Sequence, residues 1–272
     1  MSEWIKAIIF GIVEGITEWL PISSTGHLIL LNEFIRLDVT EDFYRMFEVV
    51  VQLGAILAVA VLFWKEIFPF TANRREGLRI RWDICRLWGK IFIACVPAGV
   101  IGLLFQDVFE RLFYRAVSVA LALILFGIAF LVIEERHKGR AAKINSLDEL
   151  PWDTALMIGV FQLIAAIFPG TSRSGATIVG ALLMGVSRTT AAEFTFFLAI
   201  PVMFGASLLK LLSFGFSFTS SELMILVFGM GTAFISSVLV IRFLLAFVKR
   251  HDFKVFGWYR ILLGLLVLWY FR

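Results

Sequence analysis

Two short segments of the sequence concentrate ionisable and hydroxyl side chains inside otherwise apolar stretches. The first holds two carboxylates, three adjacent hydroxyls and an imidazole: Glu14, Glu18, Ser23, Ser24, Thr25 and His27. The second holds an amide and one arginine among hydroxyls: Gln162, Thr171, Ser172, Arg173, Ser174 and Thr177. Carboxylates beside hydroxyls favour acid–base and nucleophilic chemistry, and an arginine among hydroxyls and glycines favours phosphate binding. Together the segments predict one buried site for a phosphorylated ligand.

A divalent cation would reconcile two carboxylates with a nearby phosphate group. Glu14 and Glu18 are four residues apart and share one face of a helix, so they are candidate ligands of Mg²⁺ or Ca²⁺. Alternatively, one of them is a general base. Ser23, Ser24 and His27 are the candidate nucleophiles, and the sequence leaves the choice among them open. The expected chemistry is in-line phosphoryl transfer.

Three further polar residues are candidates for a supporting role behind the groups that touch the ligand: Glu48, Gln162 and Arg260. Glu48 and Gln52 share one helix face in the apolar stretch that follows the first segment. Arg260, like Arg115, is also interpretable as an anchor that snorkels to the membrane surface from the end of a helix.

The composition is that of a membrane protein. Hydrophobic residues make up 60% of the 272 residues, charged residues make up 17%, and the mean hydropathy is +0.91. A soluble domain carries about a quarter charged residues, so this chain has too little polar surface to coat a soluble globule. The net charge of +4 comes from cations in short loops. We interpret it as membrane topology and expect no nucleic-acid partner.

Six apolar stretches approach the roughly 20 residues that a spanning helix needs: 43–64, 87–105, 116–133, 191–212, 223–247 and 255–271. Two other stretches, 4–20 and 152–168, carry the polar residues and break at Pro21 and Pro169. Each is followed by a polar turn and another apolar stretch, so each should enter the membrane and turn back. The predicted fold is all-α: an integral membrane protein with six transmembrane helices plus two re-entrant helical hairpins.

The two broken stretches match each other in sequence. Three residues of the first align with three of the second at one constant offset: Gly11, Glu14 and Pro21 with Gly159, Gln162 and Pro169. Each half then contains one hairpin and three spans, and an odd number of spans inverts the second half. We expect a single membrane domain over residues 1–272, with a first repeat half, 1–135, and an inverted second half, 150–272. Inverted repeats with broken helices are typical of transporters.

The loops predict an orientation. Cations concentrate in residues 65–90, 136–143 and 249–254, whereas residues 32–42, 106–115 and 213–222 contain fewer cations and several carboxylates. The positive-inside rule puts the first set in the cytoplasm and both termini outside.

Ionisable side chains within the membrane require partners. Each costs roughly 3 kcal/mol at the bilayer centre, so four unpaired groups would cost roughly 10 kcal/mol, comparable to the stability of a whole domain. The groups are Glu14, Glu18, His27 and Arg173. The plainest alternative is an ion pair between Glu18 and Arg173 that only locks the hairpins together. It would leave the surrounding hydroxyls unexplained.

The two segments resemble both signatures of the undecaprenyl-diphosphate phosphatases of the bacitracin-resistance type. The residues that carry the resemblance are EGITEWLPISSTGH at 14–27 and PGTSRSGAT at 169–177. Residues 47–54 and the pair Tyr259-Arg260 are also similar to the family pattern. The resemblance covers essentially the whole chain.

The resemblance implies an enzyme of the bacterial plasma membrane that removes the terminal phosphate of undecaprenyl diphosphate, at a site open to the outer, periplasmic face. The product carries cell-wall precursors, which implies roles in peptidoglycan synthesis, cell shape and bacitracin resistance. It further implies a divalent cation, a polyprenyl diphosphate substrate and contact with membrane lipid, and it leaves a homodimer open.

By position, the resemblance makes Glu14 and Glu18 the acidic pair, and it makes Ser24 and His27 the candidates for nucleophile or proton handling. The phosphate-binding candidates are Ser23, Thr25, Ser172, Arg173, Ser174 and Thr177. A polyprenyl-phosphate flippase or transporter is the alternative from another class, because the inverted repeat fits it directly; release of phosphate distinguishes the two. The acid-phosphatase-like lipid phosphatases are excluded, since their histidine position is taken by Val179 and the chain has no Arg-Pro pair.

Overall fold

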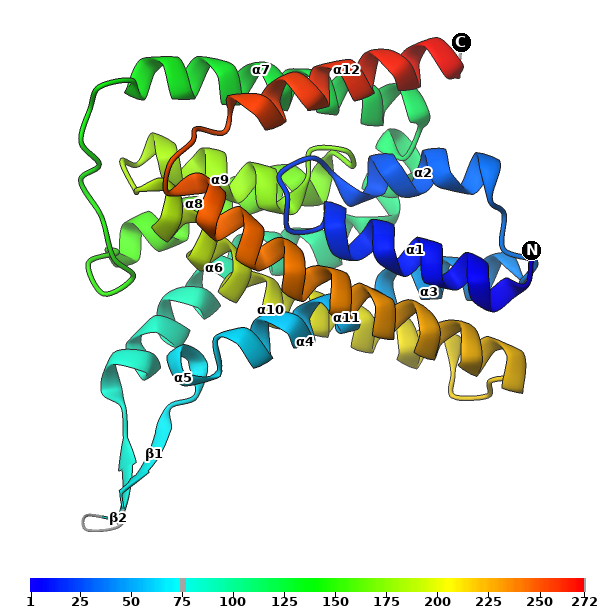
Figure 1. Ribbon diagram of the computed structural model, residues 1–272, viewed down its shortest axis with the longest axis horizontal. Helices are drawn as coiled ribbons and strands as arrows, with labels where there is room; N and C mark the ends of the chain where they lie inside the picture. The colour runs from blue at the N-terminus through cyan, green and yellow to red at the C-terminus, as the bar shows by residue number, and fades with distance from the viewer. Residues whose placement is uncertain (74–76, 272) are drawn as a thin grey trace.

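The computed structural model describes residues 1–73 and 77–271 and is dominated by helices (Figure 1). Within those residues, five helices are long and apolar enough to cross a membrane: Glu41–Leu62, Trp82–Gly102, Ala116–His137, Arg188–Phe214 and Ser220–Val248. This confirms the prediction of a helical membrane protein.

All six stretches predicted to span are helical, although their bounds differ from the prediction. The first is divided at Val51 into α3 (Glu41–Val50) and α4 (Gln52–Leu62). The others are α6 (Trp82–Phe113), α7 (Ala116–His137), α10 (Arg188–Phe214), α11 (Ser220–Val248) and α12 (Lys254–Tyr270). Helix α6 is longer than predicted and takes in most of the loop expected at 106–115. Helix α12 has 17 residues, fewer than the roughly 20 that a simple span requires.

The two broken stretches form helical hairpins with the same local geometry. Helix α1 (Glu3–Thr17) is followed by α2 (Ser24–Phe34), and α8 (Trp152–Ile167) is followed by α9 (Arg173–Leu183). Ser23 and Ser172, which precede α2 and α9, have positive φ angles of 75° and 69°. Each hydroxyl accepts a hydrogen bond from the backbone N–H three residues on, at Gly26 and Gly175.

The hairpins approach the centre of the molecule from opposite ends. In Figure 1, α1 starts at the right end and α2 returns there, whereas α8 and α9 lie toward the left. Helix α1 packs along α11, α8 packs along α6, and α7 packs along α12. Glycines allow the close approach, because a Cβ at Gly11 would overlap the carbonyl oxygen of Gly229, and a Cβ at Gly159 would overlap that of Ala94.

One element departs from the all-α prediction. The basic loop between α5 (Trp64–Ile67) and α6 contains an antiparallel β-hairpin of β1 (Phe70–Asn73) and β2 (Gly77–Ile80), with Phe70 opposite Ile80. Paired strands satisfy backbone groups that an irregular loop would leave to water, and the segment offers Phe, Thr and Ile, which favour strands. Arg74 and Arg75, two of the cations assigned to this loop, lie outside the described residues.

The connecting segments separate into two groups. The β-hairpin, the segment between α7 and α8, and the connection from α11 to α12 lie at the left end in Figure 1. The connections from α2 to α3 and from α10 to α11 lie at the right end with both termini. The loops that the sequence grouped by charge therefore gather at opposite ends of the molecule.

Candidate active site

The breaks of the two hairpins meet in the interior. The Arg173 guanidinium contacts the Glu18 carboxylate, with 2.9 Å between Nη2 and Oε1, and both side chains are largely buried. The Ser174 hydroxyl donates to the backbone carbonyl of Glu18 at 3.1 Å. The ion pair that the sequence suggested as the plainest alternative is therefore present.

Glu18 is more than the partner of an arginine. Its second oxygen, Oε2, accepts a hydrogen bond of 2.8 Å from the Ser24 hydroxyl. A hydroxyl that donates to a carboxylate has a base ready to take its proton, which is the arrangement of an activated nucleophile. The chain from Ser24 through Glu18 to Arg173 thus joins a nucleophile candidate, a base and a cation.

Arg173 is held by more than one contact and keeps donors free. Its Nη1 donates to the backbone carbonyl of Thr195 at 3.0 Å, and its guanidinium carbon lies 6.0 Å from the centre of the Trp19 ring. Its Nε has no hydrogen-bond partner among the described residues. Because a guanidinium has five N–H donors in a fixed plane, the side chain can hold its protein partners and still bind a phosphate oxygen.

A cavity of about 180 Å³ opens at this junction. Five of the predicted site residues line it: Glu18, Ser24, Thr25, Ser172 and Arg173. Gln52 of α4 and three residues of α10 complete the wall with Ala165 and the Pro169–Gly170 turn: Val202, Met203 and Ala206. The cavity therefore offers hydroxyls, one carboxylate and one guanidinium to a ligand, against an apolar side.

Other predicted phosphate-binding residues lie behind the cavity wall. Besides its bond to Glu18, Ser174 contacts the Ser172 hydroxyl at 3.0 Å. The Thr177 hydroxyl bonds to the carbonyl of Arg173 and lies 2.9 Å from the Thr195 hydroxyl. The Ser23 hydroxyl caps α2. These hydroxyls fix the two turns and α10 relative to one another.

His27 is fixed at both ring nitrogens. Nδ1 lies 2.7 Å from the backbone carbonyl of Ser23, and Nε2 lies 2.7 Å from the Tyr259 hydroxyl, with the two rings stacked at 5.6 Å. A carbonyl only accepts, so Nδ1 carries the proton and a neutral His27 accepts at Nε2 from Tyr259. His27 does not line the cavity beside Ser24 and Arg173.

Glu14 presents a different environment from Glu18. It is fully buried, and neither carboxylate oxygen has a hydrogen-bond partner among the described residues. Glu18, Glu48 and Arg173 are close enough for electrostatic interaction with it, and Gln52 lies beside it. A buried carboxylate without a partner is costly, and a cation would satisfy it, so Glu14 fits a cation ligand. No group of three or more His, Cys, Asp or Glu residues suited to a metal occurs within 1–73 and 77–271.

Gln162, the counterpart of Glu14 in the second hairpin, is also buried. Its amide oxygen and nitrogen have no hydrogen-bond partner in the part of the chain that the structure describes. Glu48 is half-buried on α3, near Tyr44. Neither Gln162 nor Glu48 lines the cavity.

Arg260 corrects one sequence interpretation. Its side chain is fully buried and does not snorkel, whereas Arg115 is exposed. It donates to the carbonyl oxygens of Pro21 at 3.1 Å, Gly170 at 3.0 Å and Thr171 at 2.6 Å. The last turn of a helix leaves backbone carbonyls without a partner inside that helix, and the two turns follow such helix ends. Arg260 donates to carbonyls of both turns. It is a positioning residue that joins the hairpins.

Comparison with known proteins gives the family of this chain. Residues 7–266 match the family described as bacitracin resistance protein BacA. The chain belongs to the BacA family. The polar residues of both hairpins, the lining of the cavity between them and Arg260 lie inside the matched range.

Relatives of this family are similar over their full length. The chain is 63% identical to an undecaprenyl-diphosphatase of Desulfitobacterium hafniense, over 100% of this chain and 97% of the relative. It is 61% identical to undecaprenyl-diphosphatase 1 of Clostridium acetobutylicum, over 99% and 97% of the two chains. It is 58% identical to an undecaprenyl-diphosphatase of Enterococcus faecalis, over 98% and 96%.

The sequence assigned no site role to two residues that contact the candidate active site. Thr195 lies on α10 and contacts both Arg173 and Thr177. Tyr259 lies on α12 and contacts His27. Both stand in apolar stretches far along the chain from their partners, where spacing carries no signal. Tyr259 was noted only as the neighbour of Arg260 in the family pattern.

Proposed function

We propose that this protein hydrolyses undecaprenyl diphosphate to undecaprenyl phosphate and inorganic phosphate. The observation that carries the proposal is the Ser24–Glu18–Arg173 chain on the wall of one cavity. The names of relatives at 58–63% identity support the same substrate. A nucleophile with its base beside a guanidinium suits transfer of a terminal phosphoryl group.

In the proposed mechanism, Ser24 Oγ attacks the terminal phosphorus and its proton passes to Glu18. The bond from phosphorus to the bridging oxygen breaks, and undecaprenyl phosphate leaves. Water then hydrolyses the phosphoserine to release inorganic phosphate. Arg173 binds the non-bridging oxygens as charge develops on them. Ser24 is favoured over His27, because both nitrogens of His27 already have partners, and over Ser23, whose hydroxyl caps α2.

A divalent cation, Mg²⁺ or Ca²⁺, belongs to this proposal, with Glu14 and Glu18 as its protein ligands. The unpartnered oxygens of buried Glu14 support it. Bound there, the cation would neutralise charge on the diphosphate. Glu18 would then serve two roles, since its oxygens also contact Ser24 and Arg173.

We also propose the finer architecture: six spanning helices and two re-entrant hairpins, related as inverted halves 1–135 and 150–272. The packing supports this. Exchanging the two halves turns the α1–α11 contact into the α8–α6 contact, and it leaves the α7–α12 contact unchanged. The matching serine caps at Ser23 and Ser172 support it as well.

The proposed location is the bacterial plasma membrane, with the cation-rich loops in the cytoplasm and the site open to the periplasmic face. Hydrolysis there would return the lipid carrier for peptidoglycan synthesis. It would also lower the amount of the diphosphate form, which accounts for the bacitracin resistance in the family description.

The test is release of inorganic phosphate from undecaprenyl diphosphate by purified protein in detergent, with and without Mg²⁺ or Ca²⁺. We expect release that depends on the cation and is abolished in Ser24→Ala. Substrate labelled in the terminal phosphate should leave label on the wild-type protein after acid quenching, and none on Ser24→Ala. His27→Ala should still be labelled, and Ser146→Ala should behave as wild type. Binding without any release would refute the enzyme, and label that survives in Ser24→Ala would refute the nucleophile.

A further inference from the structure

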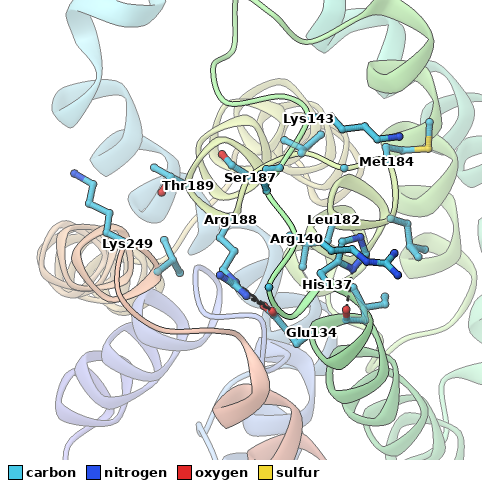
Figure 2. A pocket seen from close by; sticks show the side chains of 18 residues that line it. Glu134, His137, Arg140, Lys143, Leu182, Met184, Ser187, Arg188, Thr189 and Lys249 are labelled. Carbon is cyan, nitrogen blue, oxygen red and sulfur yellow. Dashed lines mark hydrogen bonds and ion pairs between the residues drawn. The ribbon is translucent and has the colours of Figure 1, made fainter.

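A second and larger cavity lies at the far end of α9. It has a volume of about 600 Å³, within the range of ligand pockets in proteins, and is lined by the ends of α7, α9, α10 and α11 and by residues 139–143 (Figure 2). Helix α9 begins at Arg173 in the candidate active site and ends at Leu183 beside this cavity. Its 11 residues separate the two by about 15 Å.

The lining carries an excess of positive charge. Four lysines and arginines and one histidine contribute: His137, Arg140, Lys143, Arg188 and Lys249. Among the lining residues the one carboxylate is Glu134, and its oxygens are already occupied. They accept bonds from the Arg188 guanidinium and from the backbone N–H of Phe253.

The remaining cations have room for a ligand. Figure 2 shows Arg140 and His137 on one side of the cavity, Lys249 on the other and Lys143 above, whereas Arg188 turns to Glu134. No ion pair of Arg140, Lys143 or Lys249 is present among the described residues, and the carboxylate of Glu193 interacts with Lys249 only electrostatically. His137 Nδ1 donates to the carbonyl of Ile133 at 2.8 Å, which leaves Nε2 unengaged.

The cavity is built by specific contacts. The backbone N–H groups of Lys143 and Ile144 donate to the Gly185 carbonyl at 2.8 and 3.2 Å, and Ser187 N–H donates to the Ile144 carbonyl at 2.8 Å. These bonds fix the cationic segment onto the turn between α9 and α10. The long helix α10 begins at Arg188, so its positive end adds to the field.

Topology alone does not account for this arrangement. Cations that only fix orientation need no common focus, and Lys138 and Arg250 stand at exposed positions outside the cavity. Arg140, Lys143 and Lys249 are also exposed, but they converge from two separate segments, residues 139–143 and the end of α11, on a hollow whose floor is apolar, with Leu182 and Val248. A phosphate among cations above an apolar floor is a matched ligand.

We infer that this cavity is a second phosphate-binding site, distinct from the candidate active site, for a phosphate-bearing anion. The anion is either the headgroup of an anionic lipid or free phosphate. The inference does not rest on the proposed hydrolysis.

The experiment compares binding of two probes to the full-length protein. Native mass spectrometry counts phosphatidylglycerol bound in competition with phosphatidylcholine, and isothermal titration in detergent measures inorganic phosphate. The test variant is Arg140→Gln/Lys143→Gln/Lys249→Gln. The matched control is Arg136→Gln/Lys138→Gln/Arg250→Gln, which removes the same charge from exposed residues of the same loops outside the cavity. Arg173→Ala reports binding at the candidate active site.

We expect the test variant to weaken one probe at least tenfold, because each cation near an anionic headgroup contributes about fivefold. The matched control and Arg173→Ala should retain that binding. Loss of phosphatidylglycerol alone identifies a lipid headgroup, and loss of inorganic phosphate identifies the free anion. Equal losses in test and control variants, loss only in Arg173→Ala, or no binding of either probe would overturn the inference. Lys143→Glu, a single exposed change, repeats the test if the triple variant elutes as aggregate.

Discussion

The carboxylate of Glu18 contacts both hairpins of the fold. Oε2 accepts from Ser24 of the first hairpin, and Oε1 accepts from Arg173 of the second. An ion pair that only stabilised the fold would need no hydroxyl on its second oxygen and no cavity beside it. At the scale of single residues, the chemistry and the joining of the hairpins therefore use the same atoms.

The grip of Arg173 is testable by a change that keeps its charge. The planar guanidinium contacts Thr195 and Glu18 and leaves donors for a ligand. Arg173→Lys loses this geometry. We expect phosphate release to fall at least tenfold, since about 1.4 kcal/mol of lost interaction is a factor of ten. The measurement is phosphate release in detergent, with the exposed Arg115→Lys as control. Near wild-type release from Arg173→Lys would show that the planar guanidinium is not required for phosphate binding.

Arg260 should matter for stability rather than for contact with substrate. Arg260→Met leaves buried carbonyls of Pro21, Gly170 and Thr171 without donors, and each such loss costs about 1–3 kcal/mol. We expect a lower Tm in detergent, measured by size-exclusion chromatography of samples heated to a series of temperatures. Arg115→Met, at an exposed position, should leave the Tm unchanged. Equal Tm values for both variants would show that Arg260 does not hold the turns.

At the scale of elements, small residues decide how closely the hairpins approach the spanning helices. Gly11 faces Gly229 of α11, and Gly159 faces Ala94 of α6, with backbone against backbone. Close contact of this kind supplies packing where the lipid gives no hydrophobic driving force. It also sets the depth at which each break lies, and hence whether Ser24 and Arg173 meet.

A methyl group at these glycines should therefore separate the helices. In Gly11→Ala the Cβ would overlap the Gly229 carbonyl, and we expect a destabilisation of about 1–3 kcal/mol. Gly231→Ala on α11 is the control, because a Cβ there meets nothing within 4 Å and alanine favours helix. Thermal unfolding of the two variants in detergent gives the comparison. A Tm for Gly11→Ala at or above that of Gly231→Ala would contradict the close packing.

At the scale of the whole molecule, the two ends of the bundle differ in charge. The end with the β-hairpin and residues 136–143 carries the cations, and the end with both termini carries fewer (Figure 1). The positive-inside rule then predicts one orientation for the entire chain, with the cation-rich end in the cytoplasm.

Labelling of single cysteines in intact cells tests this orientation. In a background of Cys85→Ser and Cys95→Ser, an impermeant thiol reagent should label Glu33→Cys, near the α2–α3 connection. It should not label Lys138→Cys until the membrane is permeabilised. Both positions are exposed, so accessibility within the protein does not separate them. The reverse pattern would invert the orientation.

Much of the fold could be predicted from composition and local pattern. Long apolar stretches require helices in a membrane. Helices α1 and α8 end shortly before Pro21 and Pro169, whereas α6 and α10 continue through Pro97 and Pro201. The pairing of β1 with β2 was missed, because the two strands lie in a basic loop where apolar periodicity gives no signal. The length of α6 was underestimated because its last turns are polar at an end that reaches water.

The sequence by itself determined that Glu18, Ser24 and Arg173 should lie together, since polar and ionisable groups within apolar stretches need polar partners. It did not determine which of the neighbouring hydroxyls face the ligand. Only the tertiary structure separated Ser24 and Ser172 on the cavity wall from Ser174 and Thr177 behind it, because that depends on how two turns and α10 pack together. It also buried Arg260 and engaged Nε2 of His27, since their partners lie on segments more than 80 residues away in the chain.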